Sequence, residues 1–168
     1  MAQKENNIIP MIFDEAFYRK MATQKWQQQN YKKAAEYYEK VLELSPEDFD
    51  IQQHYAQCLV KLNIGKKAER LFYENIVKDF HVAESFYELS QLNIELNEPN
   101  KAFLFGINYV ILSDDKDFRE MLEKTFEVTY TNEQKIELEA QLFSTQLLFQ
   151  FLFSQGRLEE ARAFILNQ

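Results

Sequence analysis

The chain has 168 residues, of which 46% are hydrophobic, and its formal net charge is −8. This length is enough for one domain with a core, and the apolar share excludes an intrinsically disordered chain. The negative charge disfavours a nucleic-acid partner, because an acidic chain repels the phosphate backbone. Three glycines and three prolines are too few turn formers for a many-stranded sandwich or barrel. The composition therefore predicts a mostly helical protein.

One cysteine and the lack of a long apolar segment bear on location. Cys58 has no second cysteine to pair with, which suits a reducing compartment, and we expect it to be a small buried side chain. Residues 1–10 lack the apolar run of a signal peptide. The most apolar stretch, residues 142–153, is shorter than the roughly 20 residues that a membrane span needs. We therefore expect a cytoplasmic protein without a membrane partner.

Apolar periodicity and turn residues predict about nine helices, preceded by an N-terminal arm at residues 1–13. In chain order the expected helices span 14–28, 31–44, 47–62, 65–78, 82–96, 99–112, 115–129, 132–155 and 157–167. The short turns between them predict antiparallel pairs. The SPED segment, Ser45–Asp48, is expected to be a capping box with Pro46 at the first helical position.

Three alanines mark an internal repeat. Ala34, Ala68 and Ala102 lie 34 residues apart, and residues around them keep the same step. Small residues align with small ones and large apolar residues with large apolar ones, which indicates three copies of one helix pair. Gly106 is an exception, because the equivalent position is aromatic in the first two copies. We expect a bulky neighbouring side chain, for example from the segment after Asp115, to fill the space, and the alternative is drift at a tolerant site.

This order of residues resembles the tetratricopeptide repeat, which runs aromatic, large apolar, small, alanine, aromatic and proline. The first copy matches it with Tyr18, Met21, Ala22, Ala34, Tyr38 and Pro46. The second copy departs from it, with Gln52 in place of the first aromatic residue. The resemblance implies an all-α, right-handed solenoid of antiparallel helix pairs. Three units would occupy residues 14–116, and residues 117–168 would hold an irregular helical segment and a partial fourth unit.

Catalytic and cofactor-binding patterns are missing from the sequence. It has no glycine-rich phosphate loop and no HExxH metal motif, and His54 and His81 lie 27 residues apart in different predicted helices. We therefore expect no enzyme activity, no cofactor and no metal site.

The resemblance implies a protein or peptide partner, bound on the concave face that the first helix of each pair lines. The expected contacts lie beside the core positions of those helices: Arg19, Lys20, Thr23, Trp26, His54, Gln57, Lys61, Glu84, Tyr87, Glu88 and Gln91. Their charge changes from basic to acidic along the face. A bound peptide would place its acidic end near Arg19 and Lys20 and its basic end near Glu84 and Glu88. The alternative is an ordinary solvated helix surface.

One function of the family is disfavoured by the same positions. Chaperone adaptors of this family hold a terminal carboxylate with Lys, Asn, Asn, Lys and Arg. Those places correspond here to Arg19, Thr23, His54, Glu84 and Glu88. Two acids replace two cations and would repel a carboxylate at close range, so we exclude this form of binding.

The C-terminal helices suggest a second function. In the expected helix 132–155, apolar residues occupy nearly the whole circumference: Leu142, Phe143, Leu147, Leu148, Phe149, Phe151, Leu152 and Phe153. The last helix is too short to cover them, so we expect an exposed apolar surface. It would dock further repeats of a longer array or form a homodimer through the C-terminal helices. In a third arrangement, helix 115–129 would fold over it.

Overall fold

The computed structural model describes residues 13–126 and 133–167, and the regular structure within these residues consists of nine helices. They are α1 (Glu15–Gln27), α2 (Tyr31–Leu44), α3 (Phe49–Lys61), α4 (Gly65–Val77), α5 (Val82–Glu95), α6 (Pro99–Ser113), α7 (Lys116–Phe126), α8 (Glu133–Ser154) and α9 (Leu158–Leu166). The predicted all-α fold is confirmed, and the first six helices end within two residues of their expected bounds. Most of the expected arm, residues 1–12, lies outside the described residues, as do residues 127–132.

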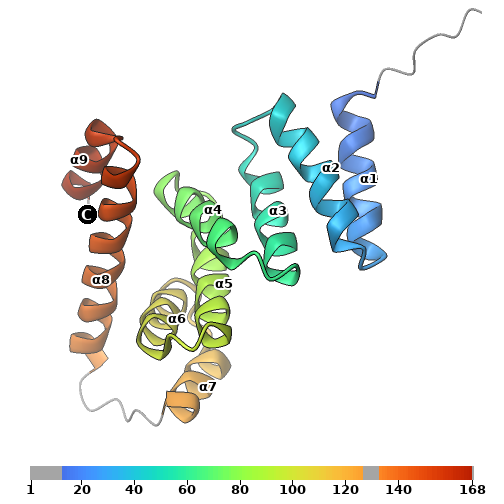
Figure 1. The fold of residues 1–168 in the computed structure, drawn as a ribbon. Helices are drawn as coiled ribbons and strands as arrows, with labels where there is room; N and C mark the ends of the chain where they lie inside the picture. Colours follow the sequence, from blue (N-terminus) through green and yellow to red (C-terminus); the bar gives the residue numbers. More distant parts are fainter. Residues whose placement is uncertain (1–12, 127–132, 168) are drawn as a thin grey trace, which may run out of the picture.

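Antiparallel pairs stack along the chain (Figure 1). The pairs α1–α2, α3–α4 and α5–α6 pack internally, and each pair contacts the next through α2 with α3 and α4 with α5. The long helix α8 lies against α6 and α4, and α9 packs on α8. The core therefore runs as a continuous column through the three pairs. No helix in the described part of the chain is long and apolar enough to cross a membrane.

The three repeat alanines lie in the core. Ala34, Ala68 and Ala102 are fully buried. In the third pair the contact between the two helices is direct, because the Ser90 hydroxyl of α5 donates a hydrogen bond of 2.8 Å to the Ala102 carbonyl of α6. A larger side chain at these places would hold the helices apart. The burial of all three alanines agrees with the repeat spacing in the sequence.

The space beside Gly106 is filled from α7, as expected. A Cβ atom at Gly106 would lie 2.7 and 2.8 Å from the two methyl groups of Leu122 and 3.0 Å from the Ser90 hydroxyl. Leu122 is itself fully buried. The glycine thus allows α7 to pack closely on α6, where the other two pairs carry an aromatic ring.

The departure at Gln52 is compensated by a buried polar network that joins α3, α4 and α5. Gln52 Nε2 donates to Asn75 Oδ1 at 2.7 Å, and Asn75 Nδ2 donates to Gln53 Oε1 at 2.7 Å. The Ser85 hydroxyl donates to the same Gln53 oxygen at 3.1 Å. Buried polar groups are costly without partners, so this network holds the second and third pairs in one register.

The predicted capping box at Ser45–Asp48 is wrong. Asp48 is the N-cap of α3, since its Oδ1 accepts a hydrogen bond of 3.0 Å from the Ile51 amide. The backbone amide of Ser45 instead continues α2 by donating to the Val41 carbonyl, and Pro46 lies in the turn between the helices. The first helical residue of α3 is therefore Phe49.

The C-terminal pair turns back along the second helices. The Arg157 guanidinium, in the turn between α8 and α9, forms ion pairs with Glu74 of α4 and with Glu160. Tyr73 of α4 and Phe151 of α8 meet edge to face with ring centroids 5.6 Å apart. Arg157 and Phe151 therefore hold α8 against the α4 side of the stack.

The expected apolar surface of α8 is exposed only in part: Leu148 and Leu152 are buried, and other apolar side chains near the C-terminal end reach water. Phe153, Leu158 and Leu166 keep 59%, 56% and 74% of their surface accessible. Helix α7 does not cover them, because it packs on α6 through Phe118 and Leu122 at the opposite end of α8 (Figure 1).

Candidate partner-binding face

The polar side chains of the first helices, α1, α3 and α5, form the candidate site. We call it the first-helix face, and it comprises Lys20, Thr23, Gln27, Asp50, His54, Gln57, Lys61, Glu84, Glu88, Gln91 and Glu95. Three side-chain contacts connect one first helix or its N-cap with the next, and they decide which charges remain free for a partner.

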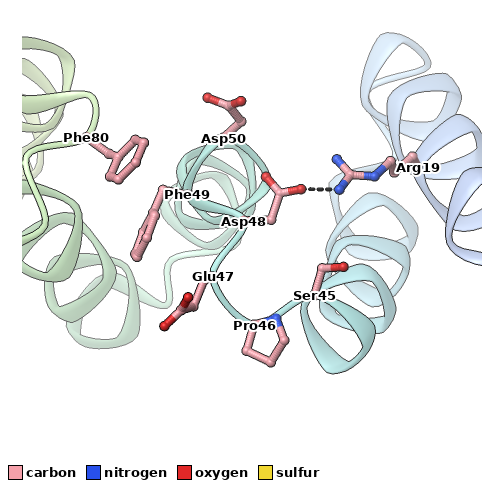
Figure 2. A pocket seen from close by; sticks show the side chains of 8 residues that line it. All are labelled: Arg19, Ser45, Pro46, Glu47, Asp48, Phe49, Asp50 and Phe80. Atoms are coloured by element: carbon pink, nitrogen blue, oxygen red, sulfur yellow. Dashed lines mark hydrogen bonds and ion pairs between the residues drawn. The ribbon is translucent and has the colours of Figure 1, made fainter.

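Arg19 fixes α1 to the start of α3. Its Nε donates to Glu15 Oε1 at 2.7 Å, and its guanidinium forms an ion pair with Asp48, the N-cap of α3 (Figure 2). The Ser45 hydroxyl also donates to Glu15 at 2.6 Å, and this bond together with Arg19 lowers the pKa of Glu15. Arg19 therefore shares its charge between two carboxylates, whereas its neighbour Lys20 is exposed.

A hollow of about 710 Å³ opens beside this ion pair, at the turns that precede α3 and α5. Figure 2 shows the rings of Phe49 and Phe80 next to each other among the residues that line it. Their centroids are 4.6 Å apart with 19° between the planes, and Phe80 remains 48% exposed. Glu47 and Asp50 add carboxylates to the rim, so the hollow combines flat apolar surface with negative charge.

Helix α3 is connected to α5 by two polar contacts. Gln57 Nε2 donates to Glu88 Oε1 at 2.9 Å, and His81 Nε2 lies 2.6 Å from Asp50 Oδ1. Glu88 is half-buried, and this burial raises its pKa. His54 is exposed, and its ring packs edge to face on Tyr38 of α2, in the preceding pair, with centroids 5.9 Å apart.

The two aromatic residues expected on this face do not come together. Trp26, in the last turn of α1, packs edge to face on Tyr31 at the start of α2, with centroids 5.1 Å apart. Tyr87 packs on Tyr109 of α6 and Phe118 of α7, although 38% of its surface stays accessible. Both rings therefore mainly cover neighbouring helices.

The predicted contact residues on this face are exposed or half-buried, which is typical of a solvent-facing helix surface. Lys20, Thr23, Lys61 and Glu84 are exposed, whereas Gln57, Glu88 and Gln91 are half-buried. The sequence reading missed the roles of Asp48, Phe49 and Phe80. A stricter assignment of the α3 N-cap would have placed Phe49 at the junction between pairs, but its partner Phe80 lies 31 residues away, beyond any local pattern.

Cys58 is fully buried, as expected, and burial raises its pKa to about 12, so it is not a nucleophile at neutral pH. The described residues contain no group of three or more side chains that could hold a metal ion.

A profile of the tetratricopeptide repeat family matches residues 25–72, which run from the last turn of α1 into α4. A crystal structure described as that of the MamA protein superposes with a TM-score of 0.59, at 17% identity, over 90% of this chain and 87% of that one. Residues 25–72 therefore match a tetratricopeptide repeat, and the described helices share the fold of that structure. The similarity to MamA concerns the fold, and no curated protein matches the sequence. Tetratricopeptide repeats generally mediate protein–protein interactions, and this match supports an interaction scaffold.

Glu88 gives the face a testable pH dependence. Because burial raises its folded-state pKa, the folded chain retains this proton to higher pH than the unfolded chain, and stability falls as the pH rises above the ordinary value of 4.5. Glu88→Gln keeps an acceptor for Gln57 and cannot ionise. We expect it to unfold at higher urea than the wild type at pH 7, and the two proteins to converge near about pH 4.

The measurement is urea unfolding followed by circular dichroism at both pH values. Glu84→Gln, at an exposed position one turn earlier, serves as the control and should change little. A Glu88→Gln protein that is less stable than wild type at pH 7, or equally shifted at both pH values, would contradict the assignment.

Proposed function

We propose that this scaffold is not an enzyme and that it binds an extended segment of a partner protein along the first-helix face. Support comes from the way the face is held. The Arg19–Asp48 pair and the Gln57–Glu88 bond connect α1 to α3 and α3 to α5. A surface whose parts are already fixed loses less conformational entropy on binding than a mobile one.

Charge gives the proposed partner a direction. Glu84 and Glu95 are exposed on α5 and form no ion pair within the described ranges, whereas Lys20 is exposed on α1. Arg19 contributes less than the sequence suggested, because Glu15 and Asp48 offset its charge. A segment with basic residues over α5 therefore fits best, and the acidic end assigned to Arg19 and Lys20 would rest on Lys20.

The proposal rests mainly on the exposed acids of α5, which form no ion pair within the described ranges and lie at one end of a fixed polar face. Gln91 lies on the same helix and Lys61 on the neighbouring one, where an amide and an ammonium group can bind a peptide backbone and a carboxylate. Removal of negative charge at α5 should slow association, because complementary charge mainly steers the encounter of two proteins.

The test reverses the two exposed acids. The wild type and a Glu84→Lys, Glu95→Lys variant are used as bait in lysate of the native host, and the association rate of the captured partner is then measured at two salt concentrations. We expect the variant to associate at least about tenfold more slowly at low salt, with a smaller difference at high salt.

The matched control is Glu36→Lys, Glu43→Lys, which makes the same charge change at exposed positions of α2. Equal association of all three proteins with the partner, or equal loss in both variants, would show that the partner does not use the first-helix face.

A second candidate function is assembly through the C-terminal end. A hollow of about 340 Å³ there is lined almost wholly by apolar side chains, among them Phe149, Phe153, Ile165 and Leu166. Soluble monomers rarely leave a large contiguous apolar patch in water. We propose that a second copy of the chain covers this patch around a two-fold axis, with further repeats of a longer array as the alternative.

Sedimentation equilibrium tests the second candidate. We expect the wild type to show a concentration-dependent dimer, and Phe153→Asp with Leu166→Asp to remain monomeric. Leu44→Asp is the control, since Leu44 is similarly exposed at 56% but lies on α2. A wild type that stays monomeric at high concentration contradicts the homodimer.

A further inference from the structure

A groove separate from the first-helix face runs between α8 and the ends of α4, α5 and α6. Its volume is about 570 Å³, within the range of roughly 300–1,000 Å³ that is usual for ligand sites. One wall is the face of α8 from Leu138 to Leu148, which is about 15 Å long at the rise of an α-helix. The opposite wall includes Leu112 of α6 and Phe86 of α5. We call this hollow the α6–α8 groove.

Apolar side chains at the groove's rim face water. Leu112, Leu138 and Leu142 keep 53%, 55% and 61% of their surface accessible. Three exposed leucines on two facing walls are more than the isolated apolar residues that occur on any surface. They make the groove suitable for aliphatic side chains.

The floor of the groove carries a polar group with an unused acceptor. Asn108 is only 6% exposed, and its Nδ2 donates to the carbonyl oxygens of Leu104 and Ala140 and to the Ser144 hydroxyl at 2.8, 2.9 and 2.9 Å. These acceptors fix the orientation of the amide, since an oxygen in place of Nδ2 could not donate to a carbonyl.

Asn108 Oδ1 accepts no hydrogen bond from any residue that the structure describes. It is also not enclosed, because the one fully buried side-chain atom without a partner in those residues is Gln53 Nε2. Asn108 is itself one of the residues that line the groove. A nearly buried acceptor of this kind favours a ligand that brings a hydrogen-bond donor.

The walls, the floor and one end together define the chemistry of the occupant. Aliphatic walls fit aliphatic side chains, and the free acceptor fits a backbone N–H of an extended chain, because a helix uses its own N–H groups internally. At the end near α4, Asp79 presents an exposed carboxylate with no ion pair among the described residues, which fits a basic residue.

We propose that the α6–α8 groove binds an extended aliphatic segment of a partner protein. One backbone N–H of the segment donates to Asn108 Oδ1, and a lysine or arginine lies near Asp79. This site is separate from the first-helix face, so a substitution that removes binding at one of the two sites should leave binding at the other unchanged.

The test is a nuclear magnetic resonance titration of the ¹⁵N-labelled full chain. The probe is a mixture of short capped peptides, each with lysine followed by Val, Ile and Leu in every order. We expect the Asn108 side-chain Nδ2 resonances to shift at millimolar peptide. The same peptides with N-methylated backbone amides should bind at least about tenfold more weakly, since the buried acceptor then lacks its donor.

Variants locate the binding. Leu142→Asp should weaken the binding by about tenfold or more, and Asp79→Lys by several-fold, because they remove an apolar contact and the attraction for the basic residue. Both positions are exposed, so we expect both proteins to fold. Leu44→Asp on α2 is the matched control and should bind like the wild type.

Several results would overturn the proposal. These are unchanged Asn108 resonances at millimolar peptide, equal binding of the N-methylated peptides, or equal loss of binding in Leu44→Asp. Asn108 resonances that shift with protein concentration alone would assign the groove to a second copy of the chain. Shifts with benzene but not with the peptides would assign it to small apolar molecules.

Discussion

The close approach of two helices at an alanine is the contact on which the rest of the structure depends. Ala34, Ala68 and Ala102 are each fully buried, as are Ala22, Ala56 and Ser90 on the partner helices, and the Ser90 hydroxyl contacts the Ala102 carbonyl directly. Small residues on both sides let the two helices of a pair cross at short range, and the same geometry recurs after 34 residues. Each pair therefore presents its first helix in an equivalent position, and the polar side chains of α1, α3 and α5 come to share one face.

Polar contacts fix how one helix pair is aligned on the next, which apolar packing alone does not. Packing alone tolerates sliding of one helix pair on the next, whereas a buried hydrogen bond has a defined geometry. The Gln52–Asn75–Gln53–Ser85 network and the Arg19–Asp48 ion pair lie at the junctions between pairs. Gln53 Nε2 remains without a partner in the described residues, so the network is not fully satisfied. These contacts also use charges that would otherwise serve a ligand, and they leave the exposed acids of α5 as the main electrostatic feature of the face.

The repeat and its core could be predicted because they depend on local periodicity. The alanine spacing predicted buried positions in all three pairs, and the glycine at Gly106 indicated a compensating side chain, which is Leu122. The site was harder to predict, because its contacts join residues of different pairs. From the sequence, Arg19 is expected to be a free cation, but in the structure it pairs with Asp48. Trp26 is likewise expected to contact a ligand, but its ring packs on Tyr31. The packing side of α8 likewise could not be predicted, because apolar residues occur around the whole helix and do not show which side packs.

The most direct test of the account is the unfolding of Ala68→Leu. Ala68 is fully buried in the middle pair, where the added side chain has no space unless α3 and α4 move apart. We expect its free energy of unfolding in urea to fall by about 1–3 kcal/mol relative to the wild type. Ala163→Leu, at an exposed position of α9, should change it little. An Ala68→Leu protein as stable as the wild type would contradict the claim that a small residue at the helix crossing sets the stack.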